Sequence, residues 1–173
     1  MVVIKYGAEK FNSLLIEYKM NIKFQNDNET LNYLKIKDFI QNIISENNKK
    51  NIHESFVWLC YHNFVELVKY FLSKCSKNNI KVDMSYDGYK CLKFAVSCYD
   101  NIDIVKFLLV HLKSDILFDI NMNNNEIFAF ACVSADDNIK NEIVSFKENN
   151  DLDNFKSTVY TFINERVDKL KNN

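Results

Sequence analysis

The residues most suited to chemistry are five cysteines and three histidines, whose tightest grouping is the stretch Cys60-Tyr61-His62. Cysteine and histidine are zinc ligands, but a zinc site takes about four ligands, and no second Cys/His pair stands at a suitable spacing. A nucleophilic cysteine needs a histidine and an orienting carboxylate beside it. The spacing favours none of the candidates, which are Cys60, Cys98, His53, His62 and His111. We therefore predict no metal, no cofactor and no catalytic residue, and a Cys/His-dependent enzyme is the less favoured alternative.

Other signatures of catalysis are missing from the sequence. It contains no HExxH motif, no nucleophile elbow and no phosphate-binding loop. Its two glycines, Gly7 and Gly88, are too few for a loop whose backbone amides cradle a phosphate. The acidic stretches 136–137 and 151–153 are interpreted as a loop and a helix N-cap, not as a catalytic carboxylate pair.

Composition indicates a globular protein that is rich in helix. Of the 173 residues, 47% are hydrophobic and 26% are charged, which excludes a disordered chain, and proline is absent. The net charge of −1 gives no general attraction to nucleic acid or to an anionic membrane. The N-terminal residues do not resemble a signal peptide, and no apolar run is long enough to span a bilayer. We read the odd number of cysteines as buried hydrophobes of a reducing compartment, and expect a cytoplasmic or nuclear protein.

The elements that must position any site repeat along the chain. The segments FVWLC at 56–60, LKFAV at 92–96 and FAFAC at 128–132 begin 36 residues apart. In each segment the apolar residues fall at i, i+3 and i+4, which is one face of a helix. The sequence therefore predicts three equivalent helices in the same register.

A second helix and a connecting segment repeat as well. VELVKYFL at 65–72 matches IDIVKFLL at 102–109, and NEIVSF at 141–146 is a looser third copy. IKVDMS at 80–85 matches ILFDIN at 116–121, and its alternating apolar residues favour a short extended arm. Asp87-Gly88 is a turn signal, since glycine tolerates positive φ, and Asn123-Asn124 is its counterpart. The predicted unit is turn, helix, loop, helix and arm, which buries its apolar faces by stacking on its copies.

These segments resemble the ankyrin repeat family. DGYKCLKFAV is similar to the family's opening DG-x-TPLHxAA, the two second helices to LEVVKLLL, and VDMS and FDIN to the closing ADVN. The resemblance covers about residues 52–146 and implies an all-α, ankyrin-like helical repeat solenoid with short finger hairpins. The family's Thr-Pro-Leu-His corner is replaced at residues 54–57, 90–93 and 126–129. With the Asn- and Lys-rich composition, the degenerate repeats resemble ankyrin proteins of large AT-rich DNA viruses such as mimivirus; a protist or bacterial source stays open.

Ankyrin proteins bind partners in a concave groove lined by turn tips and outward positions of each first helix. The resemblance therefore implies a partner-binding surface made of His53, Tyr61, His62, Tyr86, Asp87, Tyr89, Ser97, Cys98, Asn123, Asn125 and Ser134. Three of these are tyrosines, whose large rings lose few rotamers on binding and suit an interaction hot spot. The alternative is that they are ordinary exposed turn residues.

The two flanks are predicted to be helical caps. Residues 1–50 are expected to form a cap or a diverged repeat, residues 51–150 about three repeats, and residues 151–173 a capping helix, all in one structural domain. One N-terminal helix should place Phe11, Leu14, Leu15 and Tyr18 on a single face. A second should begin at Asp27 or Asn28 and bury Leu31, Leu34, Phe39, Ile40 and Ile43.

The sequence thus favours a non-catalytic protein–protein interaction module that binds a partner protein in the groove. If the source is a virus, the partner would be a host protein and the location the host cytoplasm. A self-assembling structural protein, which would be a homo-oligomer, stays open as the second hypothesis. Nucleic acid and membrane are the least favoured partners, because charge is balanced and Arg166 is the only arginine.

Overall fold

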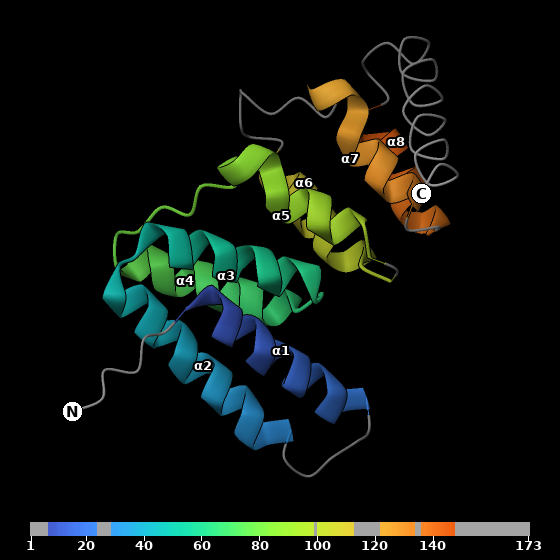
Figure 1. The fold of residues 1–173 in the computed structure, drawn as a ribbon. Coiled ribbons are helices and arrows are strands. Elements are labelled where there is room, and N and C mark those ends of the chain that lie inside the picture. The colour runs from blue at the N-terminus through green and yellow to red at the C-terminus, as the bar shows by residue number, and fades with distance from the viewer. Residues whose placement is uncertain (1–6, 24–28, 99, 113–121, 134–135, 148–173) are drawn as a thin grey trace, which may run out of the picture. The chain divides into compact units, whose positions relative to one another are not determined.

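The computed structural model describes residues 7–23, 29–98, 100–112, 122–133 and 136–147 (Figure 1). Within these ranges the chain forms eight α-helices and no β-strand, which confirms the all-α class. The helices are α1 (Ala8–Lys23), α2 (Glu29–Glu46), α3 (Lys49–Tyr61), α4 (Val65–Lys77), α5 (Tyr86–Val96), α6 (Ile102–Leu112), α7 (Met122–Val133) and α8 (Asp137–Lys147). Among the described residues, no helix combines the length and the apolar composition that crossing a bilayer requires.

The chain divides into two compact units, Met1–Cys91 and Leu92–Asn173, with the boundary inside α5. In the first unit α1 packs against α2 and α3, and α4 packs against α2 and α3 (Figure 1). The rings of Phe11 and Phe39 stack between α1 and α2, with centroids 5.5 Å apart. Phe56 and Phe71 join α3 to α4 at 6.1 Å. In the second unit α8 packs against both α6 and α7.

The two N-terminal helices confirm part of the predicted apolar faces. Phe11, Leu15 and Tyr18 of α1 are buried as expected, and so are Phe39, Ile40 and Ile43 of α2. The prediction for Leu34 was wrong, because 52% of its side chain is exposed. The buried face of α2 instead contains Ile36, which lies four residues before Ile40, one helical turn away.

The positions that repeat in the sequence are core positions within each unit. Phe56, Leu59 and Cys60 are buried in α3, and so are their counterparts Leu92, Ala95 and Val96 in α5. In the third copy Ala131 is buried, whereas Phe128 and Cys132 are half-buried. The second helices agree as well, since Leu67 and Val68 of α4 and Ile104 and Val105 of α6 are all buried. The predicted register therefore matches the burial seen in α3 and α5, and matches it only in part in α7.

Asparagine closes several helices where glycine is more usual. Asn47, Asn63 and Asn79 follow α2, α3 and α4 with positive φ values of 49°, 62° and 55°. After α3, the Asn63 N–H donates to the Cys60 carbonyl and the Phe64 N–H to the Leu59 carbonyl, each at 3.2 Å. This pair of bonds is a Schellman motif, which satisfies carbonyls that the helix end leaves without partners. The same pair recurs after α4, from the N–H groups at 79 and 80 to the carbonyls at 76 and 75.

Helix α5 begins with a left-handed turn. Asp87, Gly88 and Tyr89 have φ values of 51°, 63° and 59°, so the predicted turn at Asp87-Gly88 is confirmed and extends to the tyrosine. A left-handed conformation costs a residue with a Cβ about 1 kcal/mol or more, so the surrounding packing must hold Asp87 and Tyr89 in place. In α7, Asn125, which follows the predicted pair Asn123-Asn124, is left-handed with φ 61°.

The segment between α4 and α5 differs from the expected extended arm. Residues 80–83 are irregular and residues 84–85 form a turn, with no strand among them. The matching segment 116–121, the start at Asp27 or Asn28, and the capping helix 151–173 lie outside the described residues.

The stretch 136–137 was predicted to be a loop, but Asp136 caps α8 and Asp137 is the first residue of that helix. Asp136 Oδ1 accepts hydrogen bonds from the N–H groups of Asn138 and Ile139, at 3.0 and 3.4 Å, in the first turn of the helix. Its Oδ2 accepts the Asp100 N–H at 2.9 Å. This bond from Asp100, helped by the two cap bonds, holds the pKa of Asp136 below its usual range.

Candidate functional site

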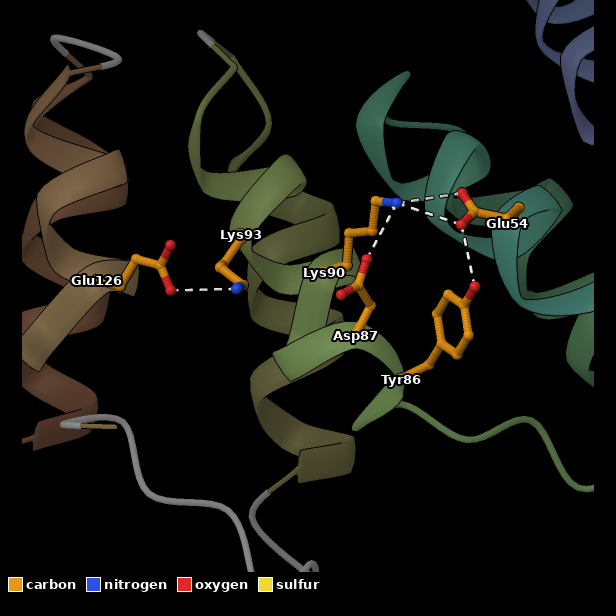
Figure 2. A network of polar contacts seen from close by, with 6 residues as sticks. All are labelled: Glu54, Tyr86, Asp87, Lys90, Lys93 and Glu126. Atoms are coloured by element: carbon orange, nitrogen blue, oxygen red, sulfur yellow. Dashed lines mark hydrogen bonds and ion pairs between the residues drawn. The ribbon is translucent and has the colours of Figure 1, made fainter. Parts of the chain in front are cut away.

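A group of polar contacts in the first unit joins α3 to the start of α5, and Figure 2 shows it. Glu54 lies at its centre. Its carboxylate accepts hydrogen bonds from the Tyr86 hydroxyl at 3.1 Å and from Lys90 Nζ at 3.2 Å. Lys90 Nζ also pairs with Asp87 Oδ2 at 3.2 Å. One lysine therefore bridges two carboxylates, one from each helix.

His53, next to Glu54 on α3, completes this group from the other side of Tyr86. The imidazole and phenol rings stack with centroids 4.8 Å apart and planes 13° from parallel. His53 Nε2 accepts the Asp83 N–H at 3.1 Å, so this nitrogen carries no proton. Asp83 in turn accepts bonds from the Ser85 N–H at 2.9 Å and its hydroxyl at 2.5 Å. We call His53, Glu54, Asp83, Tyr86, Asp87 and Lys90 the α3–α5 surface.

Three pKa shifts describe the charge state of the α3–α5 surface. Burial and the hydrogen bond to Glu54 raise the pKa of Tyr86, so its hydroxyl stays a neutral donor at physiological pH. Burial would lower the pKa of Lys90, but the bonds to Glu54 and Asp87 outweigh it and raise that pKa. The Ser85 hydroxyl lowers the pKa of Asp83. The surface thus contains three acidic residues, Glu54, Asp83 and Asp87, and one lysine, Lys90.

The structure brings three of the predicted binding residues together and buries three others. His53, Tyr86 and Asp87 belong to the α3–α5 surface. Tyr89 was expected to face outward, but only 5% of it is exposed. Its left-handed backbone follows two other left-handed residues, so its side chain does not point where a regular turn tip would point it. The expected outward position of Tyr89 was therefore wrong.

The buried positions of His62 and Asn125 also correct the expectation of an exposed groove. His62 is 7% exposed, ends α3 and donates through Nε2 to Asn12 Oδ1 of α1 at 2.7 Å. Burial, with a smaller effect of Lys19, lowers the pKa of His62 to about 4. Asn125 is 6% exposed, and its Oδ1 accepts Lys147 Nζ at 3.2 Å. Both side chains connect helices of their own unit.

The remaining predicted residues are scattered. Tyr61 is half-buried, and its ring meets that of His62 edge to face at 5.0 Å. Ser97 is half-buried and donates to the Phe94 carbonyl at 2.9 Å, and its neighbour Cys98 is half-buried too. The side chain of Asn123 and all of Ser134 lie outside the described part of the chain.

Sequence reasoning missed the charged residues Glu54, Asp83 and Lys90 of the surface, although a signal for the ion pair of Glu54 and Lys90 was present. Glu54, Lys90 and Glu126 occupy the same place in three successive repeats and alternate in sign. The structure pairs Glu54 with Lys90 in the first unit. In the second unit Glu126 pairs with Lys93, one helical turn after Lys90, at 3.1 Å (Figure 2). Opposite charges 36 residues apart could have predicted the first of these contacts.

Three of the five cysteines, Cys60, Cys75 and Cys91, are buried as predicted, whereas Cys98 and Cys132 are half-buried. Burial, and to a smaller degree Cys91, raises the pKa of Cys60 well above its usual value. Burial raises the pKa of Cys75 to about 11 and also raises that of Cys132. These thiols are protonated at neutral pH, so they are poor nucleophiles. In the ranges that the structure describes, no three His, Cys, Asp or Glu side chains are grouped as metal ligands.

No protein-family model matches the chain, and comparisons with curated proteins and with solved structures give no match either.

Proposed function

We propose that this chain is a protein-interaction module of an ankyrin-like repeat array, and that it holds a partner protein on the α3–α5 surface. The observation that carries the proposal is the stack of His53 on Tyr86, which is fixed by Glu54 and Asp83 and yet half-exposed. If the source is a large AT-rich DNA virus, the partner is a host protein and the complex forms in the host cytoplasm.

The fixed geometry of the stack favours binding. Ordering a flexible side chain at an interface weakens binding by about 1 kcal/mol. Tyr86 has few rotamers, and its hydroxyl and ring are both already engaged. It therefore offers apolar area at a small entropic cost, which is the property of an interface hot spot.

The repeat supports the same proposal from the sequence side. Core positions recur at 36 residues in α3 and α5, while the exposed residues at the same helix starts change in type and charge. In repeat proteins a constant core carries a variable surface, and the variable surface selects the partner. The residues Asp83 and Asp87, both exposed, make the surface acidic and favour a partner with basic groups at its rim.

Site-directed photocrosslinking tests the proposal. A photoreactive phenylalanine is placed at Tyr86 in one protein and at Phe107 in another, and each is irradiated in lysate of the source or host cell. Phe107 is the matched control, because it is also a half-buried aromatic residue in contact with a histidine, His111, at 4.2 Å. We expect position 86 to form one crosslinked adduct with a different protein. Excess unlabelled wild-type protein should reduce the amount of this adduct, and excess Tyr86→Ala should not.

Two results would contradict the proposal. Equal adducts at 86 and 107 would mean nonspecific contact, and an adduct of twice the chain mass would mean self-association in place of a partner. Circular dichroism of Tyr86→Ala must show the wild-type helix content, so that failed competition reports the lost side chain and not an unfolded competitor.

A further inference from the structure

A second surface, on a different pair of helices of the first unit, gathers positive charge around two aromatic rings. Lys37 of α2 places Nζ 4.4 Å from the ring centroid of Tyr33 and 5.0 Å from that of Tyr70 on α4. Lys74, also on α4, places Nζ 5.4 Å from the same Tyr70 centroid. These distances lie within the range of cation–π attraction, about 6 Å. We call Tyr33, Lys37, Gln41, Tyr70 and Lys74 the α2–α4 surface.

The rings at this surface are held in position by their neighbours. Gln41 Nε2 donates to the Tyr70 hydroxyl at 3.0 Å, so a side chain of α2 fixes the end of a ring from α4. The Tyr33 ring lies 6.0 Å from that of Tyr18 on α1. All four aromatic and lysine side chains of the surface are half-buried, so the site presents rings and ammonium groups to solvent in a defined arrangement.

No described carboxylate pairs with the ammonium groups of Lys37 and Lys74, which instead lie on tyrosine rings. Five lysines of the described residues do form ion pairs, namely Lys69, Lys90, Lys93, Lys106 and Lys140. Lys37 and Lys74 instead share one tyrosine, so their nitrogens are separated by no more than the sum of their two distances to its centroid. That upper limit is close to the Debye length at 0.1 M ionic strength, about 10 Å, so at this or lower salt their charges act together on an approaching anion.

We propose that the α2–α4 surface binds a short acidic peptide segment of a partner protein. Neighbouring carboxylates of the segment would each pair with one of the two lysines, and an apolar side chain between them would lie on Tyr33 and Tyr70. The same two helices also carry exposed acidic residues, Asp38 and Glu66, so positive charge does not run unbroken along them. A short acidic segment fits such a surface better than a nucleic acid, whose phosphates need a longer row of cations.

This inference is independent of the proposed function, because the two surfaces share no residue. Either can fail its test while the other stands.

Fluorescence anisotropy with a labelled Glu-Glu-Phe-Glu peptide tests the inference, and the same peptide with Gln in place of Glu is the ligand control. The variant is Lys37→Glu/Lys74→Glu. Its matched control is Lys35→Glu/Lys69→Glu, which changes the same two helices and the net charge equally. Lys35 and Lys69 are exposed lysines with contacts to Asn32 and Glu66, outside the tyrosine pair. A second variant, Lys37→Gln/Lys74→Gln, removes the charge without reversing it.

We expect saturable binding of the Glu peptide to the wild type and none of the Gln peptide. Affinity should fall by at least about 10-fold in Lys37→Glu/Lys74→Glu, fall less in the Gln variant, and stay within about 2-fold in the control. Equal losses in variant and control would reduce the effect to net charge and overturn the inference. So would the absence of saturable binding at low salt, or tighter binding of an oligothymidylate that the same variant abolishes.

Discussion

The helix pairs α3/α4 and α5/α6 have the same core positions but begin differently. Helix α3 starts at Lys49 behind the side chain of Asn48, which accepts the Asn51 N–H at 3.2 Å. Helix α5 starts with three left-handed residues. As a result, His53 lies half-buried on the surface, whereas Tyr89, 36 residues later, is buried. Core positions therefore transfer from α3 to α5 by spacing alone, but surface positions near the helix start do not.

The largest expected effect is a dependence of stability on pH that arises in the first helix pair and has no counterpart in the second. The first pair ends α3 with His62, and the second has Cys98 at the same place. Because the pKa of His62 falls from 6.5 to about 4 on folding, the unfolded chain binds a proton between these values that the native state does not. Stability should thus decrease as pH falls from 6.5 to 4, by up to about 3 kcal/mol from this residue.

Urea unfolding of the wild type and of His62→Gln, at a series of pH values in that range, measures this contribution. The glutamine amide can still donate to Asn12 but does not titrate, so the variant should lose less stability on acidification. Parallel pH profiles for the two proteins would show that His62 is not the buried neutral group described above.

Exchanging residues between equivalent core positions tests whether the cores of the two helix pairs have room for a side chain of the same size. Leu59 in α3 and Ala95 in α5 are both fully buried at the same repeat position. Ala95→Leu inserts the larger residue of the first pair into the second, and overpacking should cost about 2 kcal/mol. Thermal unfolding monitored by circular dichroism is the measurement. An unchanged Tm would mean that Ala95 does not face a packed core, while Ala95→Ser controls for substitution without added volume.

The loop between the two helices of each pair contains a left-handed residue, and the stability of variants at this residue can be compared between the pairs. Asn63 and Asp100 have φ values of 62° and 63° in equivalent loops. Replacing either with alanine should cost about 1 kcal/mol, because a Cβ without a compensating polar group disfavours this conformation. Glycine at the same positions should be close to neutral. Urea midpoints of the four variants give the comparison, and a loss with alanine at only one site would show that the loops are not equivalent.

The smallest effect concerns the outer faces of α4 and α6. Lys69 pairs with Glu66 on its own helix at 2.7 Å, whereas the equivalent Lys106 pairs with Glu142 of α8 at 3.8 Å. Both lysines are more than half exposed, so each alanine variant should lose only about 0.3 kcal/mol. A loss above about 1 kcal/mol for Lys106→Ala would mean that its contact with α8 contributes more than an exposed ion pair does.

How far the sequence predicts this molecule depends on how local each feature is. The helices and most of their buried residues follow from periodicity, since Phe56, Leu92 and Ala131 lie on faces that repeat every turn. The wrong positions of Tyr89 and Asn125 come from left-handed residues, which break the helical phase on which the transfer between repeats relied. The dipeptide Asp87-Gly88 predicted the turn, but no local sequence feature indicated that Tyr89 would be left-handed as well.

The two proposed surfaces show the same limit. Contacts such as Glu54 with Lys90 join residues at equal repeat positions, so spacing and charge could have found them. The sharing of Tyr70 by Lys37 and Lys74 depends on the relative rotation of α2 and α4, which neither helix encodes by itself. Such a site becomes visible only once the helices are packed.

The left-handed asparagines at the helix ends connect the fold to the nucleotide composition of its gene. Every glycine codon begins with two guanines, whereas asparagine is encoded by AAT or AAC. A gene that is poor in guanine and cytosine can therefore replace the usual glycine after a helix with the next-best residue for positive φ and still end the helix cleanly, as Asn63 and Asn79 do. Mutational bias in the genome would then change residues at positions where the backbone tolerates asparagine, and the buried helix faces between those positions would keep their apolar residues.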